Sequence, residues 1–195
     1  MSLKLNNEYW ENRYKNNETG WDVGAISTPI KEYIDQLEDK SLKILIPGAG
    51  NGYEFEYLIN KGFSNSQVVD FADTPLQNIK NRIPDLKDKQ LICSDFFELE
   101  GQYDLILEQT FFCALDPQLR TKYVEKMKSL LKPGGKIAGL LFQFPLTEVG
   151  PPFGGSANEY IELFSDDFNI KILETANNSI LPRKGNELFF IFIKK

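Results

Sequence analysis

The 195-residue sequence contains no histidine. This absence excludes triads that use histidine as the base, histidine general bases and most zinc sites. Only two cysteines occur, Cys93 and Cys113, and both lie in apolar stretches without metal-ligand spacing. We therefore expect two buried free thiols and no bound metal.

Long apolar runs and an excess of positive charge are also missing. No stretch is long enough to span a membrane, and the start MSLKLNNEYW lacks the apolar centre of a secretion signal. The formal net charge is −6, which disfavours a nucleic-acid partner because phosphate backbones repel an acidic chain. We expect a cytoplasmic monomer without membrane or nucleic-acid partners.

Strand-like stretches recur along the chain and alternate with helix-like ones. Repeated strand–helix units predict a parallel sheet covered on both faces. The last two strands are joined by a turn-rich gap without a helix, so we expect them to be antiparallel. The expected fold is α/β, a Rossmann-like, doubly wound, seven-stranded and mostly parallel sheet with an antiparallel last strand, in one domain of residues 1–195. Its strands are expected at 42–47, 67–71, 90–93, 103–107, 137–142, 169–175 and 187–193.

The connections carry recognisable helix and turn signals. Thr28-Pro29 is typical of an N-cap followed by proline in the first helical turn, and Asp116-Pro117 predicts the start of a longer helix. Further helices are expected over 53–61 and from Thr74 onward. The stretch LKPGGK (131–136) predicts a turn before the fifth strand.

Three glycines follow the first strand at every second position. Pro47 ends that strand, and Gly48, Gly50 and Gly52 lead into the next helix. In doubly wound sheets ligands bind beyond the carboxyl ends of the strands, where bare main chain and free helical N–H groups suit them. This spacing alone fits an unliganded tight turn equally well.

Acidic and aromatic residues end the next two strands. Asp70, followed by Phe71, is placed to accept hydrogen bonds from ribose hydroxyls, with Asp73 as a nearby competitor. Asp95 suits an exocyclic amine, and Phe96 suits a flat ring. Each residue also fits a plain structural role, but the three strand ends together predict a site for a nucleoside.

The glycine spacing, the LKPGGK turn and the terminal hairpin resemble the class I S-adenosylmethionine-dependent methyltransferases. Shorter motifs in the flanks resemble the thiopurine S-methyltransferase superfamily, and most of all its halide/thiol methyltransferase branch. The resemblance implies S-adenosylmethionine as cofactor, S-adenosylhomocysteine as its product and a small-molecule acceptor. These motifs are YWENRY…TGWDVGAISTPI (9–30), FFCALDP (111–117), VGPPF (149–153) and LPRKG (181–185).

The resemblance also implies roles for individual residues around the cofactor. The glycine turn lies by the methionine part, the acid of the second strand holds the ribose, and that of the third meets adenine. The N-terminal segment (1–30) covers the cofactor, where the indole faces of Trp10 and Trp21 suit a sulfonium cation. Glu108 and Thr110 match positions near the reacting methyl group, where Glu108 is expected to bind the cofactor, although it also fits a structural role.

The acceptor side is expected under the loop 144–156. The catalytic candidates are Phe153, Arg183 and Thr110, with Arg183 placed to attract an anion. Phe153 stands where plant-type halide/thiol enzymes usually carry tyrosine, so we expect thiols or hydrosulfide to be methylated faster than halides. An apolar wall is expected from four phenylalanines, Phe111, Phe112, Phe144 and Phe153.

Soft anionic acceptors suit a chain without histidine. Transfer of a methyl group from a sulfonium to a thiol, hydrosulfide, thiocyanate or halide is an in-line displacement that needs alignment rather than a base. Another acceptor, such as tellurite, a carboxylate or a phenol, stays open on the same fold. Less favoured alternatives are a nucleic-acid base methyltransferase, a nicotinamide-dependent oxidoreductase and a non-catalytic cofactor binder.

Overall fold

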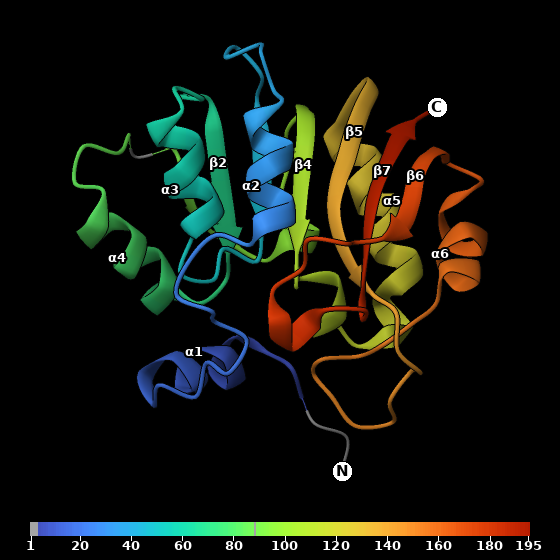
Figure 1. The fold of residues 1–195 in the computed structure, drawn as a ribbon. Helices are drawn as coiled ribbons and strands as arrows, with labels where there is room; N and C mark the ends of the chain where they lie inside the picture. The colour runs from blue at the N-terminus through green and yellow to red at the C-terminus, as the bar shows by residue number, and fades with distance from the viewer. Residues whose placement is uncertain (1–3, 88) are drawn as a thin grey trace.

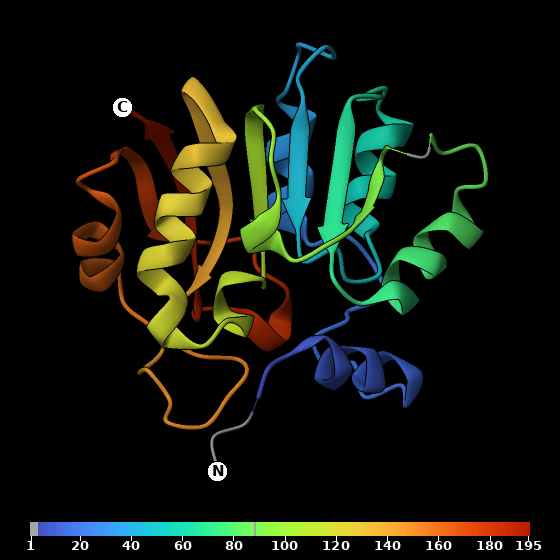
Figure 2. The same ribbon diagram turned by 180° about the vertical axis from the view of Figure 1, so that it is seen from behind.

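A computed structural model describes residues 4–87 and 89–195. Its centre is a twisted sheet in the order β3-β2-β1-β4-β5-β7-β6, with helices on both faces (Figures 1 and 2). Only β7 runs antiparallel to its neighbours β5 and β6, which confirms the expected fold class. The strands are β1 (Ile44–Pro47), β2 (Ser66–Asp70), β3 (Leu91–Cys93), β4 (Tyr103–Gln109), β5 (Leu131–Phe142), β6 (Phe168–Thr175) and β7 (Glu187–Lys194).

The helices divide between the two faces of the sheet. Figure 1 shows α2, α3 and α4 in front of the sheet, and Figure 2 shows α5 and α6 on the other face, while α1 lies below the sheet edge. Each face has its own apolar core, one around Ile30, Phe55 and Leu76, the other around Tyr123 and Phe164. The helices are α1 (Asn7–Lys15), α2 (Thr28–Asp35), α3 (Tyr53–Asn60), α4 (Asp73–Arg82), α5 (Arg120–Leu130) and α6 (Ala157–Phe164).

The sheet buries its central strands on both sides. All four residues of β1 are buried, as a parallel strand covered by helices requires. Leu45 pairs with Gln67 of β2 and with Ile106 of β4, so the carboxyl ends of the three strands reach the same edge. The loops that follow these three strands therefore lie on the same side of the molecule.

Several local expectations differ from the structure. The stretch 131–136 belongs to β5, which carries an irregularity in its pairing with β4 where Gly134 adopts φ 71°. The helix after Asp116 begins with a 3₁₀ turn, η3 (Pro117–Leu119). Asp116 caps this turn, because its Oδ1 accepts a hydrogen bond from the Gln118 amide (2.9 Å). Helices α1 and α6 and the 3₁₀ turn η4 (Leu181–Arg183) were not predicted.

The two cysteines lie in different environments. Cys113 is buried, as expected, but Cys93 is exposed, so the prediction of two buried thiols is wrong for Cys93. The physical reason is that Cys93 ends β3, a three-residue strand at the edge of the sheet. An edge strand is covered on one side only, so apolar neighbours in sequence do not guarantee burial.

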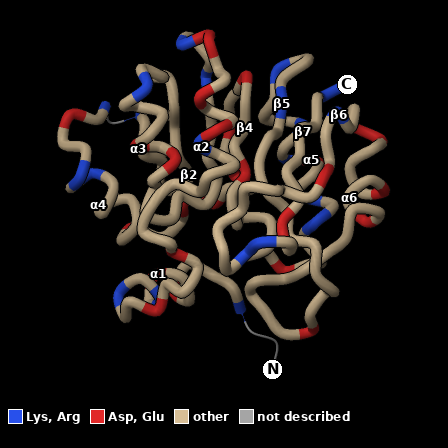
Figure 3. Tube along the Cα trace, in the orientation of Figure 1, with Lys and Arg blue, Asp and Glu red and all other residues tan. Residues whose placement is uncertain are grey.

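Charged residues of both signs are interspersed along the chain trace (Figure 3). Among the described residues we find no helix with the length and apolarity that a membrane crossing requires. Residues 1–3 of the expected N-terminal cover (1–30) lie outside the described part.

Candidate active site

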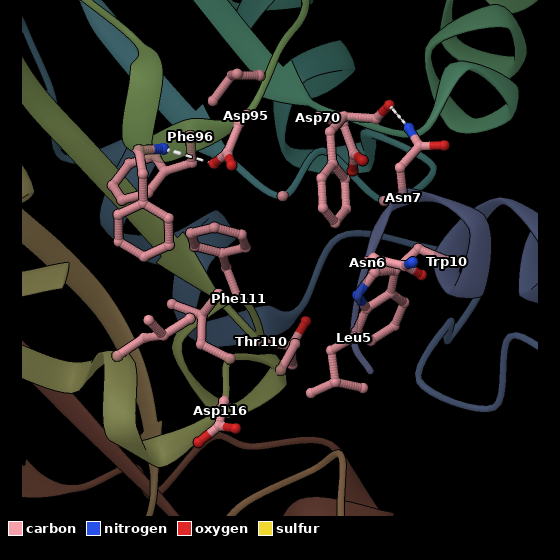
Figure 4. A pocket seen from close by; sticks show the side chains of 18 of the residues that line it. Leu5, Asn6, Asn7, Trp10, Asp70, Asp95, Phe96, Thr110, Phe111 and Asp116 are labelled. Carbon is pink, nitrogen blue, oxygen red and sulfur yellow. Dashed lines mark hydrogen bonds between the residues drawn. The ribbon is translucent and has the colours of Figure 1, made fainter. Parts of the chain in front are cut away.

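A cavity of about 700 Å³ lies at the carboxyl ends of the central strands. Figure 4 shows Asp95 and Phe96 on one side of it, Asp70 and Trp10 on the other, and Phe111 between them. These residues come from segments far apart in the chain, which meet because parallel strands end at a common edge. The structure thus brings the three predicted strand ends together.

The glycine turn after β1 forms part of the cavity wall. Gly48 and Gly50 line the cavity, and both adopt left-handed backbone angles, with φ 65° and φ 53°. At Gly48 there is a second constraint, because an added Cβ would lie 2.4 Å from Cδ2 of Phe111. An added Cβ at Gly50 would meet only the Tyr14 hydroxyl oxygen, at 3.9 Å, and Gly50 lines the cavity, so its main chain is accessible to a ligand.

Asp70 is a half-buried carboxylate at the end of β2. Its Oδ1 accepts a hydrogen bond from the Ala72 amide (2.9 Å), and its side chain lines the cavity beside Phe71. Burial raises the pKa of Asp70 to about 6, against the opposing effect of main-chain N–H groups. Above that pH the carboxylate is a pure acceptor directed at whatever fills the cavity.

Asp95 and Phe96 form the opposite side. Asp95 caps the 3₁₀ turn η1 (Phe96–Glu98) by accepting the Phe97 amide at 2.8 Å through Oδ1. The Phe96 ring stands edge-on to Phe111, with centroids 5.1 Å apart. A cap leaves the carboxylate with further acceptor capacity, so the structural role does not compete with ligand binding.

The N-terminal segment closes the cavity from outside the sheet. Trp10 of α1 packs edge-on against Trp21 (5.4 Å between centroids), and Tyr14 does the same (5.6 Å). All three aromatic residues line the cavity. Sequence reasoning missed Tyr14, although Asn6, which caps α1 by accepting the Tyr9 amide at 3.0 Å, is a typical helix-start signal.

Two side chains of α1, those of Asn7 and Glu11, bind the segment that follows β2. The Asn7 side-chain amide donates to the carbonyl of Phe71, and Glu11 accepts hydrogen bonds from the amide (3.1 Å) and hydroxyl (2.5 Å) of Thr74 on α4. Both contacts flank the end of β2. The wall made by α1 is therefore attached next to Asp70.

Thr110 lies where the large cavity meets a small polar pocket of about 50 Å³. It adopts φ 59°, a left-handed conformation that is a genuine outlier for a β-branched residue. The small pocket is also lined by Ser27, Gln109 and Arg183. Ser27 donates its hydroxyl hydrogen to Oε1 of Gln109 (2.9 Å), while the buried Gln109 Nε2 has no hydrogen-bond partner among the described residues.

Arg183 projects into this small pocket from the last loop. One guanidinium nitrogen donates to the carbonyl of Trp21 at 2.7 Å, and the other lies 3.5 Å from a carboxylate oxygen of the buried Glu187. Its neighbour Lys184 is exposed. The two basic residues are neighbours in sequence, but only Arg183 lines the small pocket, whereas Lys184 faces solvent.

Other predicted site residues lie away from the large cavity. Pro47 is buried beneath the glycine turn, Gly52 lines only the small pocket, and Glu108 is fully buried behind the wall. Phe153 is buried and lines neither pocket, and its amide donates to the Cys113 carbonyl at 2.8 Å. Of the four wall candidates, only Phe111 lines the cavity.

With this geometry established, the chain was compared with known proteins. A family model described as thiopurine S-methyltransferase (TPMT) matches residues 5–189. The chain belongs to the thiopurine S-methyltransferase family. The prediction of an S-adenosylmethionine-dependent methyltransferase is thereby confirmed, together with the cofactor class.

Curated relatives of this thiopurine S-methyltransferase family member match nearly the whole chain. The probable thiol methyltransferase 2 of Arabidopsis thaliana is 29% identical over 187 residues, covering 91% of this chain and 81% of the relative. The thiocyanate methyltransferase 1 of Brassica oleracea is 26% identical over 188 residues, with the same coverage. The bovine thiopurine S-methyltransferase is 25% identical over 196 residues, covering 86% and 78%.

Solved structures share the fold at lower identity. The 1,6-didemethyltoxoflavin-N1-methyltransferase of Burkholderia thailandensis superposes with a TM-score of 0.78 at 17% identity, over 100% of this chain and 92% of that one. A TehB-like methyltransferase of Corynebacterium glutamicum gives 0.66 at 17%, over 97% and 98%. These likenesses support the fold alone.

The residues present fit S-adenosylmethionine. The cavity offers an acceptor pair at Asp70, an acid beside an aromatic ring at Asp95 and Phe96, and accessible main chain at Gly50. The ribose hydroxyls, the adenine amine and ring, and the amino-acid tail of one such ligand call for these three kinds of group, respectively. The acceptor groups, the aromatic ring and the accessible main chain of the cavity therefore match the cofactor of the family.

Proposed function

We propose that this family member methylates a small soft nucleophile, a thiol, hydrosulfide, thiocyanate or halide, by in-line displacement. The observation that carries the proposal is the position of Thr110, which borders both the large cavity and the small polar pocket with Arg183. A group held in one compartment would face a group held in the other across this residue. Relatives named for thiols and thiocyanate support this acceptor class.

In this proposal, the walls of the large cavity hold the cofactor. Asp70 accepts hydrogen bonds from the ribose, Asp95 accepts one from the adenine amine, and Phe96 packs against the ring. Trp10 and Trp21 present indole faces to a cation. Bound S-adenosylmethionine supplies the methyl group, which its sulfonium carries. After transfer, the rest of the cofactor leaves as a neutral thioether.

Arg183 and Thr110 serve the acceptor in this proposal. The guanidinium keeps an anion at the small pocket, and the Thr110 side chain limits its approach to the large cavity. No group has to remove a proton from an acceptor that is already anionic. The neighbouring aromatic residues exclude water, and alignment of this kind contributes roughly 7–11 kcal/mol to lowering a barrier.

A product assay tests the proposal. The purified protein is incubated with S-adenosylmethionine and, in turn, hydrosulfide, thiophenol, thiocyanate and iodide, and methylated products are measured by headspace gas chromatography. We expect hydrosulfide and the thiol to react faster than iodide. Dominant methyl iodide formation would contradict the preference, and methylation of none of these acceptors would overturn the proposed acceptor class. We also propose that the protein acts as a monomer.

A further inference from the structure

Glu108 is a fully buried carboxylate at the end of β4, behind the cavity wall rather than in it. Its Oε1 accepts the amides of Phe111 (2.7 Å) and Phe112 (2.9 Å), and its Oε2 accepts the hydroxyl hydrogen of Tyr123 (2.6 Å). Within residues 4–87 and 89–195, no lysine or arginine forms an ion pair with it. Three donors thus surround a carboxylate that has no counter-charge.

Such a group is costly in a protein core. Burial raises the pKa of Glu108 to about 7, although the three hydrogen bonds oppose that rise. An apolar side chain of similar volume is often at least as stabilising as a buried charge. We therefore expect the role of Glu108 to lie in the segment that its hydrogen bonds hold in place.

The hydrogen bonds hold the turn between β4 and the 3₁₀ turn η2 (Phe112–Ala114). Thr110 opens this turn with φ 59°, and a β-branched residue keeps such a backbone angle only where its surroundings enforce it. The two amides that Glu108 binds belong to the residues directly after Thr110. The carboxylate fixes the direction of the chain just past the strained residue.

The same turn shapes the cavity. Thr110 and Phe111 both line it, and the Phe111 ring lies so close to the glycine turn that a Cβ at Gly48 would meet its Cδ2 at 2.4 Å. The ring also stands edge-on to Phe96. A shift of the turn would displace Thr110 and change the gap between the adenine side and the glycine turn.

We propose that Glu108 is a positioning residue for methyl transfer, which acts by locking the turn that carries Thr110 and Phe111. The cofactor does not touch it. The inference rests on the proposed function only in taking the large cavity as the cofactor site. Of the two roles that the sequence left open for Glu108, cofactor binding and a structural one, the proposal develops the second.

Three variants separate positioning from direct chemistry. Glu108→Gln keeps an oxygen that accepts both amides and a nitrogen that donates to the Tyr123 oxygen. Glu108→Leu keeps the volume and loses all three hydrogen bonds. Phe192→Leu removes volume from the same apolar core on β7, away from the turn, and serves as the stability control.

Three quantities are measured for each variant: the Kd for S-adenosylhomocysteine, the kcat of methyl transfer to an acceptor from the product assay, and the melting temperature. We expect Glu108→Gln to retain Kd and kcat within about threefold, and Glu108→Leu to lose about tenfold or more in both, because small misplacements in a site are amplified. Phe192→Leu lowers the melting temperature and leaves Kd unchanged. Collapse of kcat in Glu108→Gln would indicate direct proton chemistry and overturn the inference.

A folded Glu108→Leu protein with wild-type Kd and kcat would also overturn it. Should this variant not fold, Tyr123→Phe carries the test, since it removes the donor to Oε2 and lets the carboxylate turn. We expect Kd to weaken by about threefold there, and an unchanged Kd and kcat would count against positioning. Failure of the wild-type protein to bind S-adenosylhomocysteine would instead refute the proposed cofactor site.

Discussion

Arg183 donates a hydrogen bond to the carbonyl oxygen of Trp21 at 2.7 Å, across 162 positions of sequence. The contact joins the loop before β7 to the N-terminal segment at the small polar pocket. The wall of that pocket is therefore made by both ends of the chain. Arg183 is the basic residue among those that line this pocket, so its replacement tests the proposed acceptor site.

Replacing Arg183 by alanine should weaken use of anionic acceptors. We expect Arg183→Ala to raise the KM for thiocyanate by about tenfold or more, because a charge-assisted contact to the anion is lost. The matched control is Lys184→Ala, which removes the exposed neighbouring charge and should change KM by less than about twofold. Equal effects of the two changes in steady-state kinetics would show that Arg183 acts only through general charge.

Asp70 should dominate cofactor affinity. Asp70→Asn removes the charged acceptor, so we expect the Kd for S-adenosylhomocysteine to rise roughly 10- to 100-fold in titration calorimetry. Asp73→Asn, at the exposed start of α4, should leave Kd within about twofold. A folded Asp70→Asn protein with wild-type affinity would refute the ribose assignment.

Cofactor affinity should also depend on pH through Asp70. Its pKa is raised from 3.8 to about 6 by burial. The ionised form accepts hydrogen bonds from ribose hydroxyls, so affinity should fall by up to about tenfold per pH unit below that value. Protonation favours the unliganded native state, so this group's contribution to stability is present below pH 3.8 and lost as pH rises to about 6. Calorimetric titrations between pH 5 and 8 check the affinity, with Asp70→Asn as the variant that should show a flatter dependence.

Gly48 should tolerate no side chain. In Gly48→Ala the new Cβ would overlap Phe111 at a left-handed backbone angle, so we expect a loss of roughly 2–4 kcal/mol in the free energy of unfolding. Gly62 also has a positive φ, of 87°, but open space around it, and Gly62→Ala should lose only about 1 kcal/mol. Urea denaturation of both variants measures the difference, and equal losses would show that the Phe111 contact is unimportant.

Arg120 should anchor the loop 144–156. Its buried guanidinium donates to the Gly154 carbonyl at 2.7 Å, pairs with Glu159 and stacks on Phe112. Arg120→Met should lower the free energy of unfolding by roughly 2–3 kcal/mol. The control is Lys128, on the same helix as Arg120: Lys128→Met breaks an exposed pair with Asp167, which precedes β6, and should lose at most about 1 kcal/mol. Comparable losses in urea denaturation would contradict the anchoring role.

The strand ends could be predicted from the sequence because their positions follow from topology. Once the strands before Gly48, Asp70 and Asp95 are parallel neighbours, their carboxyl ends must share an edge. Apolar runs and turn residues are enough to define such strands. The sequence therefore predicts the location of the cavity and three of its polar side chains, those of Asp70, Asp95 and Thr110.

Roles that depend on packing could not be predicted. Glu108 follows a strand as Asp70 does, and only the surrounding Tyr123 and the turn amides show that its carboxylate is buried in the core. Phe153 was expected at the acceptor, but its loop folds back onto the Cys113 carbonyl, a contact between distant segments. Gln109 could not be recognised in the sequence as a residue of the small pocket, because an amide side chain at the end of a strand is common.

The two indoles described above have a practical consequence. The chain contains only two tryptophans, and both line the large cavity. All tryptophan fluorescence of this protein therefore originates from residues that line the large cavity, of which Trp21 also lines the small pocket. An emission spectrum recorded during a titration would report ligand entry directly, without any label and without a background signal from elsewhere in the molecule.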